Sequence, residues 1–254
     1  MRNCVILGSG RSGTSLTAGM LHGAGYHCGP DLLPPTPGNP SGYFESRVIE
    51  GLNEAILASV TRHRPERWPE DRVGPGFTYG QRWLAAPRRS ARLQAPDGFE
   101  DDVARLCATQ PFAFKDPRFS FTLPLWRPLL GDTRFVVVFR DPATTVSSIL
   151  REHASEEYLA LFRLTPRRAH RSWQAHYRHI LDIHAETGDW LFLHYDQLFT
   201  SDGQERLRSF LDTDLDLQFI DPTLRRSNPK TAAPRAARRT YAELLRRAGM
   251  TGDH

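Results

Sequence analysis

The sequence predicts an α/β fold in which a central parallel sheet is flanked by helices on both faces. Short apolar segments alternate along the chain with segments of helical period, and turn residues separate them. Residues 134–139 are almost entirely apolar, as expected for a strand that is covered on both faces. Strands that alternate with helices favour parallel pairing, and 254 residues suffice for a single large domain.

The first predicted unit is a strand, a turn and a helix. Residues 5–7 are apolar and end at Gly8, and residues 14–24 carry apolar side chains along one helical stripe. Prolines and glycines then predict long loop insertions at 26–42 and 63–80. Further strands are predicted at 111–115, 134–139 and 190–195. Further helices are predicted at 44–59, 97–109, 142–153, 166–187, from 201 onward, where Ser201 and Gln204 have capping-box spacing, and at 241–248.

Composition and charge exclude several classes of protein. The chain has 39% hydrophobic and 24% charged residues, an ordinary globular composition. Its apolar runs are far shorter than the ~20 residues that cross a bilayer, so no membrane span is expected. The first residues lack the apolar stretch of a signal peptide, which predicts a cytoplasmic protein. A net charge of +4 with scattered arginine pairs fits small anionic ligands better than nucleic acid.

Cysteine and lysine are both scarce. Cys4, Cys28 and Cys107 show no CxxC spacing, so we expect free thiols rather than disulfides or a metal bound through sulfur. Of the 33 basic residues only Lys115 and Lys230 are lysines, which makes the position of each one informative.

Ligands of parallel sheets bind at the carboxyl ends of the strands, and a glycine-rich segment follows the first predicted strand. Residues 8–15 read Gly-Ser-Gly-Arg-Ser-Gly-Thr-Ser and lead into a helix. The glycines let backbone amides converge, and the helix N-terminus adds positive potential, which is typical of a phosphate cradle. A glycine turn without a ligand is the alternative.

The same segment departs from the Walker pattern of ATP-binding proteins. Gly8, Gly13 and Ser15 match that pattern, but Thr14 stands in place of its lysine, and Arg11 supplies a positive charge from the middle of the loop. ATP chemistry depends on the missing lysine and on magnesium. A P-loop kinase or nucleotide hydrolase is therefore an alternative interpretation rather than the favoured one.

A second motif follows the strand 134–139. Arg140 stands at the strand end, and Ser148 lies eight positions later, two turns into the next helix. A guanidinium binds a phosphate through two parallel hydrogen bonds, so the two residues are suited to holding a phosphate ester. By itself Arg-Asp-Pro can equally be an ion pair at the start of a helix.

In these two motifs the chain resembles sulfotransferases that use 3′-phosphoadenosine 5′-phosphosulfate (PAPS), a family with a P-loop-type α/β sheet. The resemblance implies that the first loop binds the 5′-phosphosulfate and that the second motif binds the 3′-phosphate. The implied cofactor-binding residues are Gly10, Arg11, Ser12, Gly13, Thr14, Ser15, Arg140 and Ser148. Residues 42–45, 114–118, 126–128 and 219–222 are similar to segments of bacterial members.

The expected reaction is in-line transfer of the sulfuryl group to an acceptor hydroxyl, with adenosine 3′,5′-bisphosphate as product. A sulfuryl group carries less charge than a phosphoryl group, so side chains and loop amides suffice and no metal is required. Arg11 and the loop amides are expected to stabilise the departing phosphate oxygen. Lys115, at the end of a neighbouring strand, is a second candidate, with a surface ion pair to Asp116 as the alternative.

Glu45 is the expected base. Relatives that act on carbohydrates place a catalytic glutamate shortly after the first helix and its loop, as Glu45 is placed here. A carboxylate with a raised pKa accepts a proton at neutral pH. An ordinary glutamate at a helix N-terminus is the alternative. Members with a histidine base place it where Pro117 stands, which leaves His153 as a weaker substitute.

Residues 1–222 are expected to form the sulfotransferase-like domain, and the basic segment 223–254 to pack on or cover the cofactor site. The candidates for covering the adenosine are Arg225, Arg226 and Lys230. The acceptor is expected to be a small molecule or carbohydrate, bound by residues 26–45 and 63–95. Aromatic candidates for stacking on it, or for local core, are Trp68, Phe77, Tyr79 and Trp83. The oligomeric state stays open, and a non-catalytic nucleotide-binding protein is a further alternative.

Overall fold

Four parallel strands form the central sheet in the order β2-β1-β3-β4, which confirms the predicted architecture. The computed structural model describes residues 1–36, 38–63, 76–221, 229 and 232–250. The strands are β1 (Asn3–Leu7), β2 (Ala113–Lys115), β3 (Thr133–Phe139) and β4 (Trp190–His194). In the register of the sheet Val5 lies beside both Phe114 and Phe135, so β1 is an inner strand.

Helices cover both faces of the sheet. They are α1 (Thr14–Gly23), α2 (Arg47–Ala58), α3 (Phe99–Cys107), α4 (Phe119–Trp126), α5 (Pro142–Ser155), α6 (Pro166–His179), α7 (Ser201–Leu211) and α8 (Arg235–Arg247). Short 3-10 turns lie at η1 (Arg82–Leu84), η2 (Arg127–Leu129), η3 (Glu157–Leu159), η5 (Tyr195–Phe199) and η6 (Leu217–Phe219), and the π-turn η4 (Ile180–His184) extends α6.

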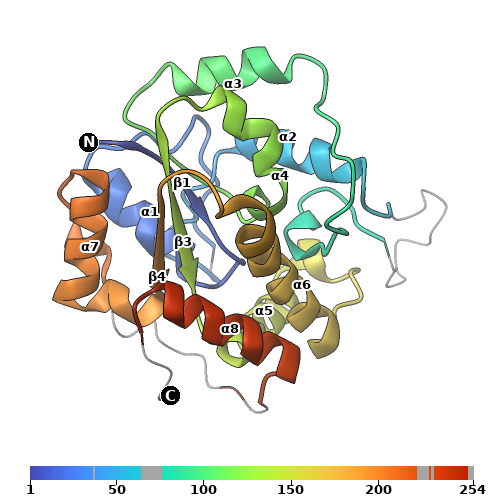
Figure 1. The fold of residues 1–254 in the computed structure, drawn as a ribbon. Coiled ribbons are helices and arrows are strands. Elements are labelled where there is room, and N and C mark those ends of the chain that lie inside the picture. Colours follow the sequence, from blue (N-terminus) through green and yellow to red (C-terminus); the bar gives the residue numbers. More distant parts are fainter. Residues whose placement is uncertain (37, 64–75, 222–228, 230–231, 251–254) are drawn as a thin grey trace.

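Alternating side chains of the strands divide the core between the two faces. Cys4 and Ile6 face α1 and α7, whereas Val5 and Leu7 face a larger cluster that includes α4, α6 and α8. Figure 1 shows α1 and α7 on one side of the sheet and α4 and α6 on the other. Since both faces are covered, the strands are apolar throughout, which is the pattern that the sequence displays.

The structure differs most from the predicted elements in three places. Helix α4 was not predicted, because its residues are apolar on nearly every side and include Pro124. The cap of α7 is Thr200, whose side chain accepts a hydrogen bond from the Gly203 N–H, and not Ser201. Helix α8 begins at Arg235, six residues before the predicted start. These differences concern one missed helix and the first residues of two others, and they leave the order of the strands unchanged.

The cysteines are free thiols, as predicted, with Cys4 and Cys28 buried. In the part of the chain that the structure describes, no helix combines the length and apolar character needed to cross a membrane. The carboxyl ends of all four strands meet at one edge of the sheet. The segments predicted to carry the chemistry follow these ends.

Candidate active site

The loop 8–15 joins β1 to α1 at this edge and depends on glycine. Gly13 has a φ of 100°, and a Cβ there would lie 2.5 Å from the Tyr195 ring. A Cβ at Gly10 would lie 2.6 Å from the Trp83 ring. Gly13 immediately precedes α1, and no side chain caps that helix. The first N–H groups of α1 are therefore open to an anion.

The Ser12 side chain anchors the loop to α6. Ser12 is fully buried, and its Oγ lies 2.9 Å from the hydroxyl of Tyr177. The same hydroxyl lies 2.9 Å from the carbonyl oxygen of Val138 and accepts a hydrogen bond from the Ser9 N–H at 3.2 Å. Burial raises the pKa of Tyr177, so this hydroxyl stays protonated. What Ser12 can offer a ligand is its backbone, since its side chain is occupied.

The first of two cavities at this edge has a volume of about 400 Å³ and brings the two predicted motifs together. Predicted residues that line it are Arg11, Gly13, Thr14, Ser15, Arg140 and Ser148. The Arg140 guanidinium lies over the Tyr195 ring, 4.3 Å from its centre. Because that ring also lies against Gly13, one aromatic side chain supports both motifs.

Arg11 connects the loop to the second motif. It adopts a φ of 67°, and its guanidinium donates to the Gly38 carbonyl oxygen at 2.9 Å and to Ser148 Oγ at 3.3 Å. Arg11 Nε also lies 3.5 Å from Oε2 of Glu152, an ion-pair distance. The positive charge of Arg11 is thus held between the loop, the 26–42 insertion and α5.

Glu45 and Lys115 form a buried ion pair beside the loop. Lys115 Nζ donates to Glu45 Oε1, and it lies 3.3 Å from Ser15 Oγ. The Lys115 side chain is 1% exposed and that of Glu45 is 11% exposed. The alternative of a surface pair between Lys115 and Asp116 is wrong, because Lys115 is buried and Asp116 pairs with Arg118.

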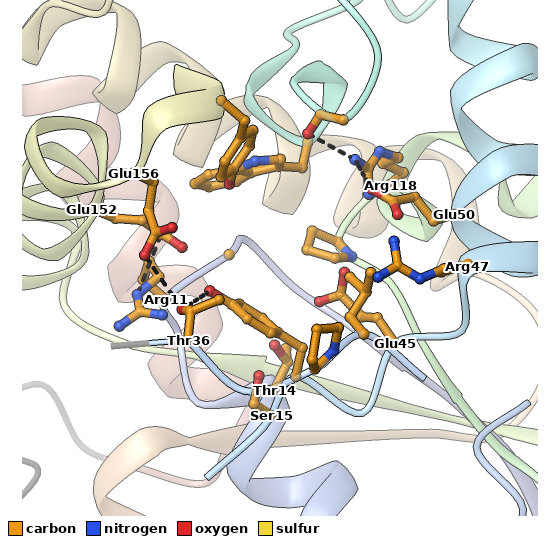
Figure 2. A pocket seen from close by; sticks show the side chains of 18 of the residues that line it. Arg11, Thr14, Ser15, Thr36, Glu45, Arg47, Glu50, Arg118, Glu152 and Glu156 are labelled. Atoms are coloured by element: carbon orange, nitrogen blue, oxygen red, sulfur yellow. Dashed lines mark hydrogen bonds and ion pairs between the residues drawn. The ribbon is translucent and has the colours of Figure 1, made fainter. Parts of the chain in front are cut away.

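The second cavity has a volume of about 380 Å³ and contains the predicted base. Figure 2 shows Glu45 and Glu50 on one side of it and Glu152 and Glu156 on the other. Both cavities are lined by Arg11, Thr14, Ser15 and Glu152. A group bound in one cavity can therefore meet a group bound in the other at the start of α1.

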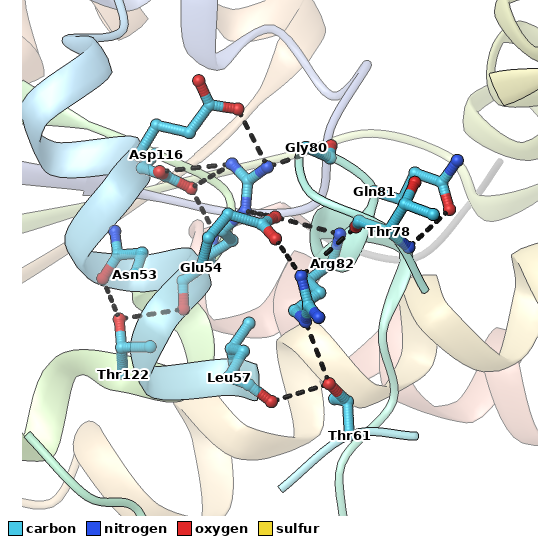
Figure 3. Close-up of polar contacts among 12 residues, drawn as sticks. Asn53, Glu54, Leu57, Thr61, Thr78, Gly80, Gln81, Arg82, Asp116 and Thr122 are labelled. Atoms are coloured by element: carbon cyan, nitrogen blue, oxygen red, sulfur yellow. Dashed lines mark hydrogen bonds and ion pairs between the residues drawn. The ribbon is translucent and has the colours of Figure 1, made fainter. Parts of the chain in front are cut away.

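A buried ionic network (Figure 3) borders the second cavity through Arg118 and Glu50. Arg118, 1% exposed, lies 2.7 Å from Glu54 Oε1, 3.2 Å from Asp116 Oδ1 and 3.2 Å from Glu50 Oε1. Glu54 also accepts from Arg82 Nη1 at 2.6 Å, which ties α2 to η1. Burial raises the pKa of Glu50 to about 7, while the charge of Arg118 opposes that rise.

The remaining predicted site residues divide into three groups. Tyr79 and Trp83 line the second cavity, as expected for residues that contact an acceptor. Phe77 instead stacks on Phe162 in a satellite core cluster. Trp68 lies outside the described residues.

The contacts of Pro117 and His153 show whether a histidine base is available at either position. Pro117 lines the second cavity. His153 Nε2 lies 2.6 Å from the Phe162 carbonyl oxygen, and His153 lines neither cavity. The ring of His153 therefore serves the contact between α5 and the following loop.

Helix α8, the described part of the basic C-terminal segment, packs on α6 and β4. Tyr241 OH lies 3.0 Å from His194 Nε2, and Arg178 pairs with Glu243 at 2.7 Å. No residue of 232–250 lines either cavity. Residues 225, 226 and 230, the candidates for covering the adenosine, lie outside the described residues.

Sequence reasoning missed several residues of the site. Glu152 lies four positions after Ser148, on the same helix face, so helical period was the signal that could have found it. Tyr195 directly follows β4, at an edge where site residues were expected, yet it was assigned to the strand. Arg118 lies in the segment 114–118 noted for its similarity to bacterial members, but its role, like that of Tyr177, depends on contacts distant in sequence.

Comparisons with known proteins agree with this architecture. The model of a family described as "Sulfotransferase family" matches residues 4–217. No curated protein matches the sequence. A solved sulfotransferase domain from the Synechococcus PCC 7002 olefin synthase is 18% identical with a TM-score of 0.54, and 96% of each chain is covered.

Two further solved structures are similar to the chain. A sulfotransferase domain from the curacin biosynthetic pathway is 16% identical with a TM-score of 0.55, covering 96% of this chain and 98% of that one. Sulfotransferase STF9 from Mycobacterium avium is 15% identical with a TM-score of 0.53, covering 98% of this chain and 77% of that one. At these identities the similarity to the three structures concerns the fold.

Proposed function

The chain belongs to the sulfotransferase family, and from this premise we propose that it transfers the sulfuryl group of PAPS to a hydroxyl of a small-molecule or carbohydrate acceptor. The observation that carries the proposal is the junction of the two cavities at Arg11, Thr14 and Ser15. One cavity has the groups that a doubly phosphorylated donor requires, and the other has a buried carboxylate for an acceptor hydroxyl.

The first cavity suits the donor. Arg140 and Ser148 would hold the 3′-phosphate at one end, and the uncapped N–H groups of α1 with the loop 10–15 would hold the 5′-phosphosulfate at the other. A phosphate needs converging donors and positive charge, and this cavity supplies both. The crowding of Gly10 and Gly13 by aromatic rings supports the same assignment, because it keeps the loop in the cradle conformation.

The reaction forms a bond between the acceptor oxygen and sulfur and breaks the bond between sulfur and the bridging phosphate oxygen. The acceptor proton passes to Glu45, and the products are a sulfate ester and adenosine 3′,5′-bisphosphate. Lys115 orients the Glu45 carboxylate, and its ammonium group beside Ser15 stabilises charge near the leaving oxygen. Arg11 contributes the second positive charge at the same point, and the mechanism uses no metal.

Calorimetry and a transfer assay test this proposal. The protein should bind adenosine 3′,5′-bisphosphate more tightly than ADP or ATP, and it should move label from the sulfuryl group of PAPS to a hydroxyl compound. Magnesium-dependent turnover of ATP would favour the kinase or hydrolase alternative. Binding of the bisphosphate without transfer to any member of a broad acceptor panel would indicate a non-catalytic nucleotide-binding protein.

A further inference from the structure

The second cavity has an unusual balance of charge for a small-molecule pocket. Four carboxylates line it, those of Glu45, Glu50, Glu152 and Glu156. The guanidinium groups that line it are those of Arg11, Arg47 and Arg118. Lys115 pairs with Glu45 and Arg118 pairs with Glu50, so the charge balance of the wall depends on Glu152 and Glu156, beside Arg11.

The basic groups on that wall already have acidic partners. Arg47 pairs with Asp31 at 3.6 Å, outside the cavity. Arg118 is enclosed by Asp116, Glu54 and Glu50, as described above. Arg11 pairs with Glu152 and, in the proposed reaction, also serves the donor. Every described guanidinium of the wall already pairs with an acidic side chain. An acceptor carboxylate or sulfate would therefore meet carboxylates here, so this cavity disfavours anionic acceptors.

The excess of negative charge is concentrated at Glu152 and Glu156. These residues are four positions apart at the end of α5 and lie together at one side of the cavity, above Arg11 (Figure 2). The Glu152 side chain is 4% exposed, and its Oε2 accepts no hydrogen bond within the described structure. Burial raises the pKa of Glu152, Arg11 lowers it, and the neighbouring Glu156 raises it again. Arg11 thus pairs with Glu152, and Glu156 adds a second negative charge beside that pair.

A chain of hydroxyl groups holds Glu156 in place. Thr36 Oγ1 donates to Glu156 Oε1 at 3.3 Å, and it lies 2.8 Å from the Tyr43 hydroxyl. Since the Thr36 proton is used toward Glu156, the Tyr43 hydroxyl donates to Thr36. Tyr43, Trp83 and Tyr158 line the same cavity as the two carboxylates and give it aromatic surface. Carboxylates next to aromatic faces are the usual environment of a bound ammonium group.

We propose that the acceptor carries, besides the hydroxyl that receives the sulfuryl group, a protonated amine that binds between the carboxylates of Glu152 and Glu156. This inference rests on the proposed function and narrows the acceptor to hydroxylated amines. The amine would supply the second positive charge that this side of the cavity lacks. The reacting hydroxyl would lie toward Glu45 and Ser15, across the cavity from the amine.

Matched acceptors on two scaffolds test the proposal. The sugar set is D-glucosamine and N-acetyl-D-glucosamine, which differ only at the C2 nitrogen. The phenol set is tyramine, N-acetyltyramine and 4-hydroxyphenylacetate, and it supplies the carboxylate. Transfer of label from PAPS is measured for each compound. Within a set, we expect the amine to exceed the acetamide at least about tenfold in kcat/KM, as a charge-assisted hydrogen bond provides, and the carboxylate to be the poorest acceptor.

Two variants connect that preference to the carboxylates. Glu156→Gln should reduce the ratio of amine to acetamide turnover about tenfold, whereas Glu157→Gln, one position along and outside both cavities, should leave it unchanged. Thermal melting confirms that both variants fold. An equal or higher kcat/KM for the acetamide or carboxylate, no turnover of either amine, or an unchanged ratio in Glu156→Gln would overturn the inference.

The proposed function has a separate readout. If the wild-type protein binds adenosine 3′,5′-bisphosphate and sulfates the acetamide or carboxylate probes as well as the amines, the proposed function stands and the inferred amine site is wrong. Failure to bind the bisphosphate would remove the proposed function itself.

Discussion

Replacing both members of the buried pair Lys115–Glu45 should cost clearly less stability than the two single replacements added together. Lys115→Met leaves a carboxylate that is 11% exposed without its cation, and Glu45→Gln leaves an ammonium group that is 1% exposed with only Ser15 Oγ beside it. Breaking a buried ion pair from one side costs about 3–5 kcal/mol, so each single variant should lose about that much free energy of unfolding.

The double variant, Glu45→Gln with Lys115→Met, distinguishes pairing from packing. It contains neither buried charge, so its loss should be about 3 kcal/mol smaller than the two single losses added together. Urea unfolding of all four proteins gives the coupling energy. The exposed pair Arg105–Asp102 on α3 is the control, and Arg105→Met should cost under about 1 kcal/mol. Strictly additive losses at Glu45 and Lys115 would refute the electrostatic account.

Four further outcomes are expected. Glu45→Gln should lower turnover by about 10²–10⁴-fold while affinity for adenosine 3′,5′-bisphosphate stays near wild type, and retained turnover would remove Glu45 as the base. Glu50 has a raised pKa of about 7, so its contribution to the free energy of unfolding falls as pH rises from about 4.5 to 7. Glu50→Gln should remove about 2–3 kcal/mol of that fall, measured by urea unfolding at several pH values. An unchanged dependence of the unfolding free energy on pH would contradict the assignment. Gly13→Ala should abolish most bisphosphate binding in calorimetry, whereas Gly25→Ala, with a similar φ of 98° and no atom within 4 Å of its added Cβ, should bind normally. Arg118→Met should cost about 3–5 kcal/mol in thermal or urea unfolding because it leaves Asp116 and Glu50 without this cation and Glu54 with Arg82 alone, and a loss below 1 kcal/mol would be inconsistent with the network.

Much of the fold could be predicted because its signals are local. Apolar period marked all four strands, and the glycines of 8–15 and the Arg140 to Ser148 spacing marked two ligand-binding segments. The rule that ligands bind at the carboxyl ends of parallel strands then placed these segments at one edge. The structure brings them together in one cavity, with Arg11 in direct contact with Ser148.

The rest depended on contacts that no local pattern records. Glu45 and Lys115 are 70 positions apart, and Arg118 reaches Glu54 across 64 positions. Sequence neighbours suggested that Lys115 pairs with Asp116. Successive side chains instead point to different sides, and Lys115 meets Glu45 just before α2 while Arg118 meets Glu50 and Glu54 on α2. Helix α4 was missed for a related reason, since a helix that is apolar all round has no period to detect.

The most direct measurement of the central claim is the affinity of Arg140→Ala for two nucleotides that differ by one phosphate. We expect calorimetry to show adenosine 3′,5′-bisphosphate binding weakened by about 2–4 kcal/mol, with binding of ADP nearly unchanged, because Arg140 is assigned to the 3′-phosphate. An equal loss for both nucleotides, or no loss for the bisphosphate, would contradict the placement of the donor in the first cavity.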